Sequence, residues 1–517
     1  MADSDMIVLT DSAGDVDTSD QLTMTSAFQK VFIANGANLK VGDFINTKLT
    51  TTDIKPAGKV YPTSGTVLTG DSSGAKMIVD FCTISDAAGY VYGYRTTTET
   101  FIDTEKAEGT VATPTGLAGD VSFTLTADET ANPHWYDWTI YSADSTYFGA
   151  MPEKAYLVCT YRGRLVLAGN PEYPNQWYMS RIANPFDFLY GAGDPMSAVA
   201  GNNADAGQCP DIVRALISFH DDYLVFGCAS TIWILRGDAV AGGSLDNLSD
   251  TTGMYGANSW CFDDNRNLYF WGTGGVYKIE SDFSNITNLT ETLLPDVIND
   301  EAADPTTHRI TMGYDKKRHG LNIAITVLTT GVNSDYFFSF KTNGFFPETY
   351  PEECGPYSML YYDANDPDYA DLLIGCKDGY IRKFVDTAKD DDIGDTNEAI
   401  TSYVTYPITP LGEEDEEGKL AEMVFDLSGG AADGKFSDTD EVTYSLFKGD
   451  DAETVLEDII DVADAFKSGT LSGTGRKNKI RPRMRGAYMG LKLANSTASE
   501  TWSVNKVKFS TRKAGKL

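Results

Sequence analysis

Histidine is rare in this sequence, with four residues among 517. His134, His220, His308 and His319 are far apart, and none stands at metal-ligand spacing from another His or from a Cys. The seven cysteines are odd in number and scattered, and no two form a Cys-x-x-Cys pair. This pattern indicates buried, reduced thiols and argues against a disulfide framework or a zinc motif. We therefore expect no metal site.

Long apolar runs are also missing. No stretch of about 18 uncharged apolar residues occurs, so we expect no transmembrane helix and no membrane insertion. The N-terminal segment MADSDMIVLTDSAGDVDTSD is acidic and lacks the basic start and apolar run of a signal peptide.

Positive charge is scarce overall. The chain has 41 Lys and Arg against 75 Asp and Glu, a net charge of −34, which repels nucleic acid phosphates and argues against sequence-specific DNA binding. The deficit is uneven, because residues 476–517 hold twelve Lys and Arg and one Glu. A basic end on an acidic chain predicts self-association or docking to an acidic partner. The alternative is a solvated basic sheet face.

Glycine, tyrosine and phenylalanine are abundant, and a repeated pattern of apolar strand, polar turn and apolar strand runs through the middle of the chain. The turns lie roughly 50 residues apart, which is the size of a propeller blade. Most of these hairpins are followed by a further strand. The five hairpins span residues 156–169, 215–227, 259–272, 308–325 and 357–375.

We therefore predict an all-β protein, an irregular β-propeller with an inserted small β-domain and a C-terminal β-sandwich. A hairpin at residues 29–44 contributes a further blade, so residues 1–44 form the N-terminal segment and first propeller strands. Residues 45–150 are the insert, 151–400 the blades and 401–517 the sandwich with its basic end. Within the sandwich, residues 453–466 have apolar residues at helical spacing and predict a capping helix.

Three short motifs resemble reactive or ligand-binding sites. GDSSG at residues 70–74 matches a nucleophile turn, but a strand pattern follows it instead of a helix. GGAADGKF at residues 429–436 has Phe436 where a phosphate-binding loop needs Ser or Thr. The acidic stretch 363–371 lacks the glycine of a calcium loop. We interpret all three as turns, and expect no catalytic residues, no cofactor and no enzyme activity.

Four segments resemble the tail nozzle, or tail tubular, proteins of short-tailed bacteriophages and the related tail hub and DNA-stabilising proteins. The segments are KVFIANGANLKVGDF, GRLVLAGNPEYPNQWYMSRIANPFDF, LISFHDDYLVFGCASTIWILRGD and the C-terminal RPRMRGAYMGLKLANSTASETWSVNKVKFSTRKAGKL. The resemblance spans most of the chain outside residues 45–150.

The resemblance implies a structural virion protein of the tail, assembled in the cytoplasm of the host bacterium. It implies a homohexameric ring that contacts the portal or adaptor and other tail proteins. Genomic DNA would be retained in its channel and ejected through it without sequence-specific binding. The alternative is a receptor-binding or host-surface adhesin of a phage tail, with the insert as its sugar-binding face.

Two sets of residues are the candidate subunit contacts under this interpretation. The first is a rigid aromatic and proline surface made by Tyr173, Pro174, Trp177, Tyr178, Pro185, Phe186 and Phe188. The alternative for this set is a cap within one blade. The second set is basic and consists of Arg476, Lys477, Arg481, Arg483 and Arg485.

Overall fold

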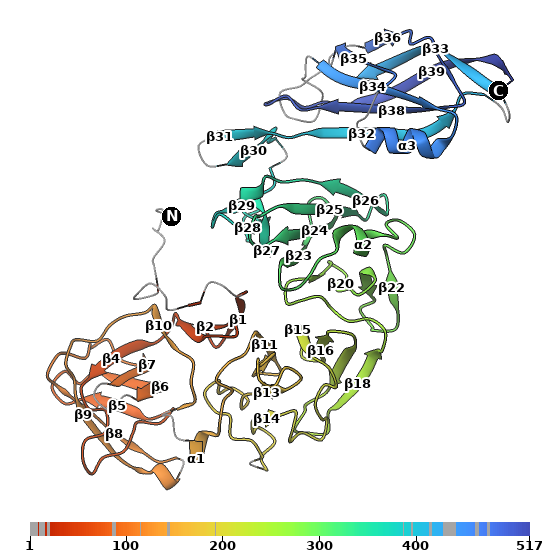
Figure 1. The fold of residues 1–517 in the computed structure, drawn as a ribbon. Coiled ribbons are helices and arrows are strands. Elements are labelled where there is room, and N and C mark those ends of the chain that lie inside the picture. Colours follow the sequence, from red (N-terminus) through yellow and green to blue (C-terminus); the bar gives the residue numbers. More distant parts are fainter. Residues whose placement is uncertain are drawn as a thin grey trace. The chain divides into compact units, whose positions relative to one another are not determined.

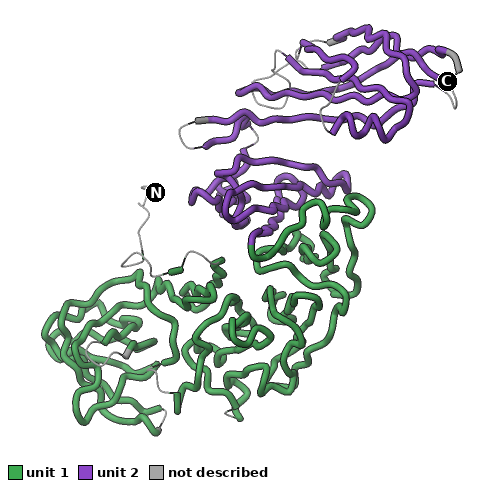
Figure 2. The backbone as a smooth tube through the Cα atoms, viewed as in Figure 1, with its two compact units in different colours: residues 1–306 green, residues 307–517 purple. Residues whose placement is uncertain are grey.

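The computed structural model confirms an all-β chain (Figure 1). It describes residues 9, 16–17, 21–84, 89–113, 115–141, 145–191, 193–385, 387–393, 396–412, 416–427, 441–460, 465–472 and 476–516. The chain divides into two compact units, residues 1–306 and 307–517 (Figure 2). Each unit is built from small antiparallel sheets.

The first unit contains four antiparallel sheets of four strands each in its described part. The strands of the first sheet are β1 (Thr23–Ala27), β2 (Lys30–Ala34), β3 (Leu39–Asp43) and β10 (His134–Asp137). The second contains β11 (Leu157–Tyr161), β12 (Arg164–Ala168), β13 (Trp177–Met179) and β14 (Val199–Ala200). The third contains β15 (Val213–Phe219), β16 (Tyr223–Cys228), β17 (Ile232–Arg236) and β18 (Ser244–Ser249). The fourth contains β19 (Trp260–Phe262), β20 (Leu268–Gly272), β21 (Gly275–Ile279) and β22 (Ile286–Asn288).

These sheets have the form of propeller blades and are packed in series. The first strand of one sheet lies beside the first strand of the next, β1 beside β11 and β11 beside β15. One apolar core joins the second sheet to the third, and another joins the third to the fourth. Central strands such as β12 and β20 are buried at every position, because each face of their sheet is covered.

The insert is a six-stranded sheet that interrupts the first blade. Its strands, in spatial order, are β4 (Thr47–Thr51), β7 (Gly89–Arg95), β6 (Lys76–Ile84), β5 (Val67–Gly70), β8 (Lys106–Val111) and β9 (Gly119–Thr124). The chain then returns to the first sheet, where β10 pairs with β3. The predicted insert, residues 45–150, thus includes one strand of a blade. Its sequence gave no sign of this return because β10 is only four residues long.

The second unit begins with two more blades. One contains β23 (His308–Asp315), β24 (Gly320–Val327), β25 (Asn333–Ser339) and β26 (Gly344–Glu348). The other, here called the last blade, contains β27 (Pro356–Tyr362), β28 (Asp371–Cys376) and β29 (Ile381–Lys383), and its β27 packs beside β23. A two-stranded hairpin of β30 (Asp390–Ile393) and β31 (Thr396–Ala399) follows. All six predicted hairpins form antiparallel strand pairs.

The C-terminal residues form the predicted sandwich. One sheet has the order β32 (Ser402–Pro410), β38 (Tyr488–Asn495), β34 (Glu441–Gly449) and β35 (Lys467–Ser472). In the other, β33 (Glu416–Leu427) pairs with β36 (Arg476–Ile480) and β37 (Met484–Gly486) along one side and with β39 (Val504–Lys516) along the other. Buried residues of both sheets, including Phe425 and Tyr444, form its core.

Helices are few and short in the described part of the chain. The predicted capping helix is α3 (Ala452–Ile460), which buries Val455 and Ile459 against Phe447. Residues 461–464 of the predicted helix lie outside the described residues. The other helical turns are η1 (Thr115–Leu117), α1 (Ser145–Phe148), α2 (Val297–Glu301) and η3 (Glu352–Cys354). None of the described helices is long and apolar enough to cross a membrane.

Phe81 belongs to the insert and packs against residues of the blades, so it holds the insert in place on them. It is fully buried, and its ring stacks on Tyr136 of the first blade at 5.2 Å and on Phe186, beyond β13, at 4.2 Å. We expect Phe81→Ala to lower the free energy of unfolding of the first unit by about 3–5 kcal/mol, because it leaves a cavity between three segments. Chemical denaturation followed by tryptophan fluorescence measures this loss.

The matched control is Tyr94→Ala, since Tyr94 lies in the same insert and is 56% exposed. Its effect should be within about 0.5 kcal/mol of wild type. Equal stability of the two variants would contradict the role assigned to Phe81.

Candidate functional site

The aromatic and proline-rich segment begins at a tight hairpin. Arg162 and Gly163 join β11 to β12, and both have positive φ, 49° and 70°. This conformation fits a two-residue turn whose twist matches that of the flanking strands. The hairpin therefore fixes the direction in which the chain continues toward residues 170–190.

Three of the predicted aromatic contact residues are inside the protein. Trp177, Phe186 and Phe188 are each 0% exposed, so their assignment as a subunit-contact surface is wrong. Trp177 packs near Phe226 of the third blade, and its indole N–H donates to the Gly207 carbonyl oxygen at 3.1 Å. The physical reason is that these large rings fill the spaces between neighbouring sheets. The alternative, a cap within one blade, does not describe Trp177 and Phe186 either, because Trp177 packs toward the third blade and Phe186 stacks on Phe81 of the insert.

The other members of this set have different environments. Tyr173 is 59% exposed, whereas Tyr178 is half-buried, with its ring 6.5 Å from that of Tyr190. Pro174 is half-buried, and its carbonyl oxygen accepts a hydrogen bond from the Val213 amide, at the start of the third blade. Tyr173 is therefore the aromatic member of the set that is free to meet another molecule through most of its side chain.

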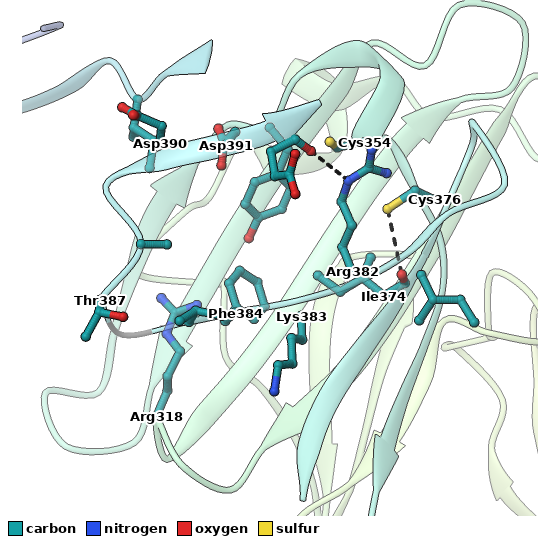
Figure 3. A pocket seen from close by; sticks show the side chains of 16 residues that line it. Arg318, Cys354, Ile374, Cys376, Arg382, Lys383, Phe384, Thr387, Asp390 and Asp391 are labelled. Atoms are coloured by element: carbon teal, nitrogen blue, oxygen red, sulfur yellow. Dashed lines mark hydrogen bonds between the residues drawn. The ribbon is translucent and has the colours of Figure 1, made fainter. Parts of the chain in front are cut away.

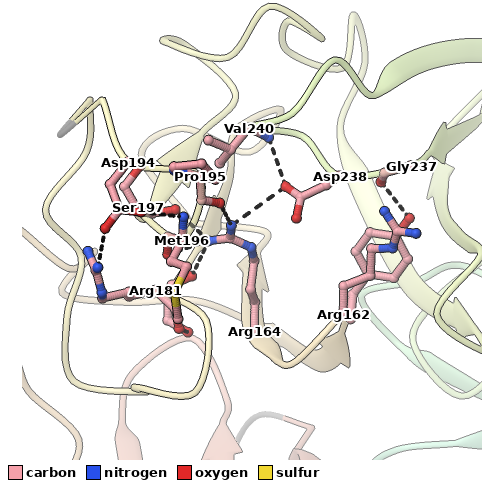
Figure 4. A network of polar contacts seen from close by, with 12 residues as sticks. Arg162, Arg164, Arg181, Asp194, Pro195, Met196, Ser197, Gly237, Asp238 and Val240 are labelled. Atoms are coloured by element: carbon pink, nitrogen blue, oxygen red, sulfur yellow. Dashed lines mark hydrogen bonds and ion pairs between the residues drawn. The ribbon is translucent and has the colours of Figure 1, made fainter.

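Arg164 organises a polar network between the second and third blades (Figure 4). Its side chain is 1% exposed and forms an ion pair with Asp238 at 3.6 Å. Asp238 lies in the loop that follows β17. The guanidinium also donates to four backbone carbonyl oxygens, those of Ser180, Pro195, Met196 and Ser197. A buried charge is tolerated because it is paired and hydrogen-bonded.

Neighbouring residues extend this connection. The Tyr161 hydroxyl donates to the Gly237 carbonyl oxygen at 2.7 Å, and Arg162 Nε donates to the Asp221 carbonyl oxygen at 2.8 Å. Arg181 forms an ion pair with Asp194 at the edge of the same network. The β11–β12 hairpin is thus fastened to the third blade at several points, which resists sliding of one sheet past the other.

The predicted basic contact residues lie on the sandwich. Lys477, Arg481, Arg483 and Arg485 are exposed, while Arg476 lies on β36 with its side chain outside the described residues. Arg481 is 3.4 Å from Glu422, and Arg485 forms an ion pair with Glu417. The acidic residues of β33 therefore neutralise part of this charge within the chain.

Strand pairing adds further cations to the same surface. In register across three strands, Lys419 of β33 stands between Arg485 of β37 and Arg512 of β39. In a second row, Lys479 and Lys508 flank Val424 of β33. We call the surface formed by Lys419, Lys479, Arg485, Lys508 and Arg512 the basic sheet face.

Like charges placed opposite each other on a sheet are unfavourable unless an anion balances them. Lys419, Lys508 and Arg512 are exposed, and none of them has a carboxylate partner among the described residues. The sequence showed the basic end but could not show that Lys419 joins it, because residue 419 is more than sixty positions from Arg481. Alternating basic residues in VNKVKFSTRK were the available signal for β39.

A pocket of about 690 Å³ lies in the second unit between the last blade and the β30–β31 hairpin (Figure 3). Its apolar wall includes Ile374, Ile381 and Phe384, and Cys354 and Cys376 line it as well. Burial raises the pKa of the Cys354 thiol to about 11, and burial also raises the pKa of Cys376. Both thiols are therefore protonated at neutral pH and are weak nucleophiles.

The cations of this pocket are already neutralised. Arg382 binds both carboxylate oxygens of Asp378, at 2.8 and 2.7 Å, and donates to the Asp392 carbonyl oxygen at 3.0 Å. Arg318 pairs with Glu348 and lies over the ring of Phe337 at 3.8 Å. The Asp392 contact joins the last blade to the hairpin, and Arg318 also lies over the ring of Phe384, which follows β29, at 5.1 Å, so the pocket is built as a joint between elements.

Asp391 is the one carboxylate in the pocket whose pKa is raised, to about 6. Burial is the main cause, followed by the charges of Glu398 and Asp390. Glu398 is its cross-strand partner in the hairpin. Asp390 instead accepts hydrogen bonds from the backbone amide and hydroxyl of Ser499, at 2.6 and 2.9 Å, and so connects the hairpin to the sandwich.

Two of the three short motifs lie within the described residues. Ser72 lies in an exposed turn between β5 and β6, and its hydroxyl donates to the Asp71 carboxylate at 3.0 Å. In the acidic stretch 363–371, Asp363 pairs with Lys316, and Asp371 pairs with Lys317 and Lys383. GGAADGKF lies outside the described residues.

Clusters of potential metal ligands are absent from the residues that the structure describes. All seven cysteines are buried and free, as their spacing predicted.

Comparisons with known proteins assign no family. No protein-family model matches the chain, and no curated protein matches it. Among solved structures, a streptogramin B lyase matches with TM-score 0.30 at 11% identity, covering 71% of this chain and 94% of its own. An exo-β-1,3-galactanase from Phanerochaete chrysosporium matches with TM-score 0.24 at 8% identity, covering 68% and 95%. An auxiliary nutrient binding protein from Bacteroides ovatus matches with TM-score 0.26 at 9% identity, covering 74% and 90%. Likenesses this weak carry no argument about fold or activity.

Substitutions of Trp177 and Tyr173 should have different effects on stability, although the two residues are only four positions apart. We expect Trp177→Ala to destabilise the first unit by about 3–5 kcal/mol, because a fully buried ring is lost between two blades. Tyr173→Ala should leave stability within about 0.5 kcal/mol of wild type. Thermal unfolding of both variants measures the difference, and a destabilised Tyr173 variant beside a normal Trp177 variant would refute the burial pattern.

We expect Asp391 to make the β30–β31 hairpin sensitive to pH. Its folded pKa of about 6 lies above the unfolded value of about 3.9, so folding favours the protonated acid. This contribution to stability is complete below about pH 4 and is lost as the pH rises through 6. Hydrogen exchange, corrected for intrinsic rates, should show more protection of residues 390–399 at pH 5 than at pH 7.

Asp391→Asn should remove this difference and keep the hairpin protected at pH 7. The control is Asp392→Asn, because Asp392 is exposed on the same strand, and this variant should retain the wild-type pH dependence. An unchanged pH profile in Asp391→Asn would show that another group is responsible.

Proposed function

We propose that this chain is a structural subunit of a ring-shaped phage tail nozzle or hub, whose channel retains the genome and lets it leave. The proposal joins the family resemblance of four sequence segments to the arrangement of charge in the folded chain. In this role the protein acts as a rigid passage and carries out no chemical reaction.

The observation that carries the proposal is the separation of charge. The basic sheet face has three cations in register on neighbouring strands, while the rest of an acidic chain supplies the opposite charge. A surface of one sign on a protein of the other sign favours association between copies, since each copy offers both partners. This supports a homo-oligomer, and the family resemblance makes it a hexamer.

The acidic character of the chain also suits a channel for DNA. Lys and Arg contacts to phosphate are what hold DNA on a protein, and a net charge of −34 opposes such contacts. DNA would then slide along the lumen without being gripped. The basic sheet face would be used in contacts between subunits, away from the DNA.

Stiffness is the second property that a passage needs. Apolar cores shared between consecutive sheets and the buried Arg164 network both oppose shear within the first unit. Contacts with the portal or adaptor and with other tail proteins would be made by such a ring in the virion tail. The chain would be assembled in the host cytoplasm before it joins the virion.

Self-assembly of the purified full chain tests the proposal. We expect electron microscopy to show rings with a central channel, and light scattering to give a mass of several subunits. The assembly should weaken when NaCl is raised from about 0.05 to about 0.5 M, because charge pairs at a surface are screened.

A monomer at every concentration, or a chain missing from the tail of purified virions, would reject the proposal. Binding to host glycans that is lost on deletion of residues 45–150 would instead favour the adhesin. Since Phe81 of the insert is packed among blade residues, the deletion must first be shown to fold.

A further inference from the structure

The last blade carries the most exposed apolar side chains of the described chain. Of the six large apolar residues with the highest exposed fraction, four belong to this blade and its turns: Leu360 at 65%, Tyr369 at 66%, Tyr380 at 63% and Ile381 at 64%. Clustered exposed apolar groups of this kind mark interaction sites, whereas single ones are ordinary.

Strand register places part of this set on one face. Leu360 of β27 is paired with Leu373 of β28, and Gly375 of β28 is paired with both Ser358 and Ile381. Residues that are paired, or two apart on a strand, share a face, so Leu360 and Ile381 point the same way. The opposite face, with Met359 and Leu372, covers Gly313 of the neighbouring blade.

Acidic side chains border this apolar surface. The loop between β27 and β28 carries the exposed Asp368, next to Tyr369, and Asp363, whose side chain is 76% exposed although it forms an ion pair with Lys316. An apolar and aromatic centre with a charged rim is the usual composition of a protein interface. We call the surface made by Leu360, Asp363, Asp368, Tyr369 and Ile381 the aromatic-acidic face.

The basic sheet face has the complementary chemistry. Lys508 and Arg512 project from β39, are exposed and have no carboxylate partner among the described residues. Cations of this kind bind carboxylates and also stack on tyrosine rings. The two faces lie on different sheets of the same unit, so every copy of the chain presents both.

We propose that the basic sheet face of one copy binds the aromatic-acidic face of the next copy. Because the two faces differ, the contact is head-to-tail, and repetition of such a contact closes into a ring when the rotation between copies allows it. The inference rests on the proposed function and names the surfaces by which its subunits meet.

A nucleic acid or another polyanion fits only half of these observations. It would bind the basic sheet face but would be repelled by Asp363 and Asp368, leaving the aromatic-acidic face uncovered. A second copy accounts for both faces with one partner. The same reasoning disfavours an unrelated basic protein, which would leave the basic sheet face unpaired.

Charge reversal on each face provides the test. Variant one is Lys508→Glu with Arg512→Glu, and variant two is Asp363→Lys with Asp368→Lys. Each variant alone brings like charges together at every contact. We expect each variant to assemble only at a protein concentration about tenfold higher than wild type requires, or higher still, as measured by light scattering.

An equimolar mixture of the two variants should recover assembly. In an alternating ring, the reversed basic sheet face of variant one meets the reversed aromatic-acidic face of variant two, and the other contact is native. A contact within a single chain cannot be restored by mixing, so the mixture separates the two cases. Circular dichroism and thermal unfolding of each variant check that it is folded.

The matched control is Lys55→Glu with Lys76→Glu, which changes the net charge as variant one does but at exposed residues of the insert. It should assemble at the wild-type concentration. If variant one and variant two, each tested alone, assemble at the same concentration as wild type, the inference is overturned and the proposed ring is left intact. Failure of the mixture to recover, or binding of DNA by wild type that variant one abolishes, would also overturn it.

A wild-type chain that never assembles would overturn the inference and the proposed function together. Loss of assembly in variant one and the control alike would overturn the inference only, because the added negative charge that these two variants share would then be responsible. The named contact is supported if neither variant assembles normally by itself, the mixture of the two does, and the control assembles as wild type does.

Discussion

Apolar packing between neighbouring sheets is the interaction on which the first unit depends. Strands such as β12 and β20 are buried at every position, so neither face of their sheets tolerates water. Each sheet must be covered by the next, and the shared cores around Phe81, Trp177 and Phe270 result from this need. The last blade differs from these sheets. Its strand β27 alternates between partly buried and exposed side chains, so one face of the blade is left uncovered.

Polar groups between the sheets fix their positions after burial has brought them together. Apolar contacts are not directional, and alone they would allow one sheet to shift along another. Arg164 prevents this because its ion pair with Asp238 and its bonds to four carbonyl oxygens are satisfied in a single arrangement. In the second unit, Arg382 has a similar role between the last blade and the hairpin. Both guanidiniums are used for structure and are not available to a substrate.

Charge acts over longer distances than apolar packing and affects which molecules the protein can associate with. The chain has a large negative excess, yet sheet pairing collects Arg485, Lys419 and Arg512 into one row. Within the chain such a row is a source of repulsion, whereas against an acidic partner it is a source of attraction. The aromatic-acidic face supplies an acidic partner of this kind on the same chain. In the proposed ring, the stability of one chain and the association between chains would make opposite demands on the same residues.

The sequence by itself determined the all-β class, the six hairpins, the sandwich strands and the buried thiols, because these follow from local alternation, turn residues and cysteine spacing. Only the tertiary structure decided the roles of the aromatic residues at 177, 186 and 188. Aromatic composition is the same for a core and for an interface, and which of the two a ring joins depends on sheets that are distant in sequence. The return of the chain at β10 and the recruitment of Lys419 to the basic sheet face were decided in the same way, since strand pairing over long separations leaves no local signal.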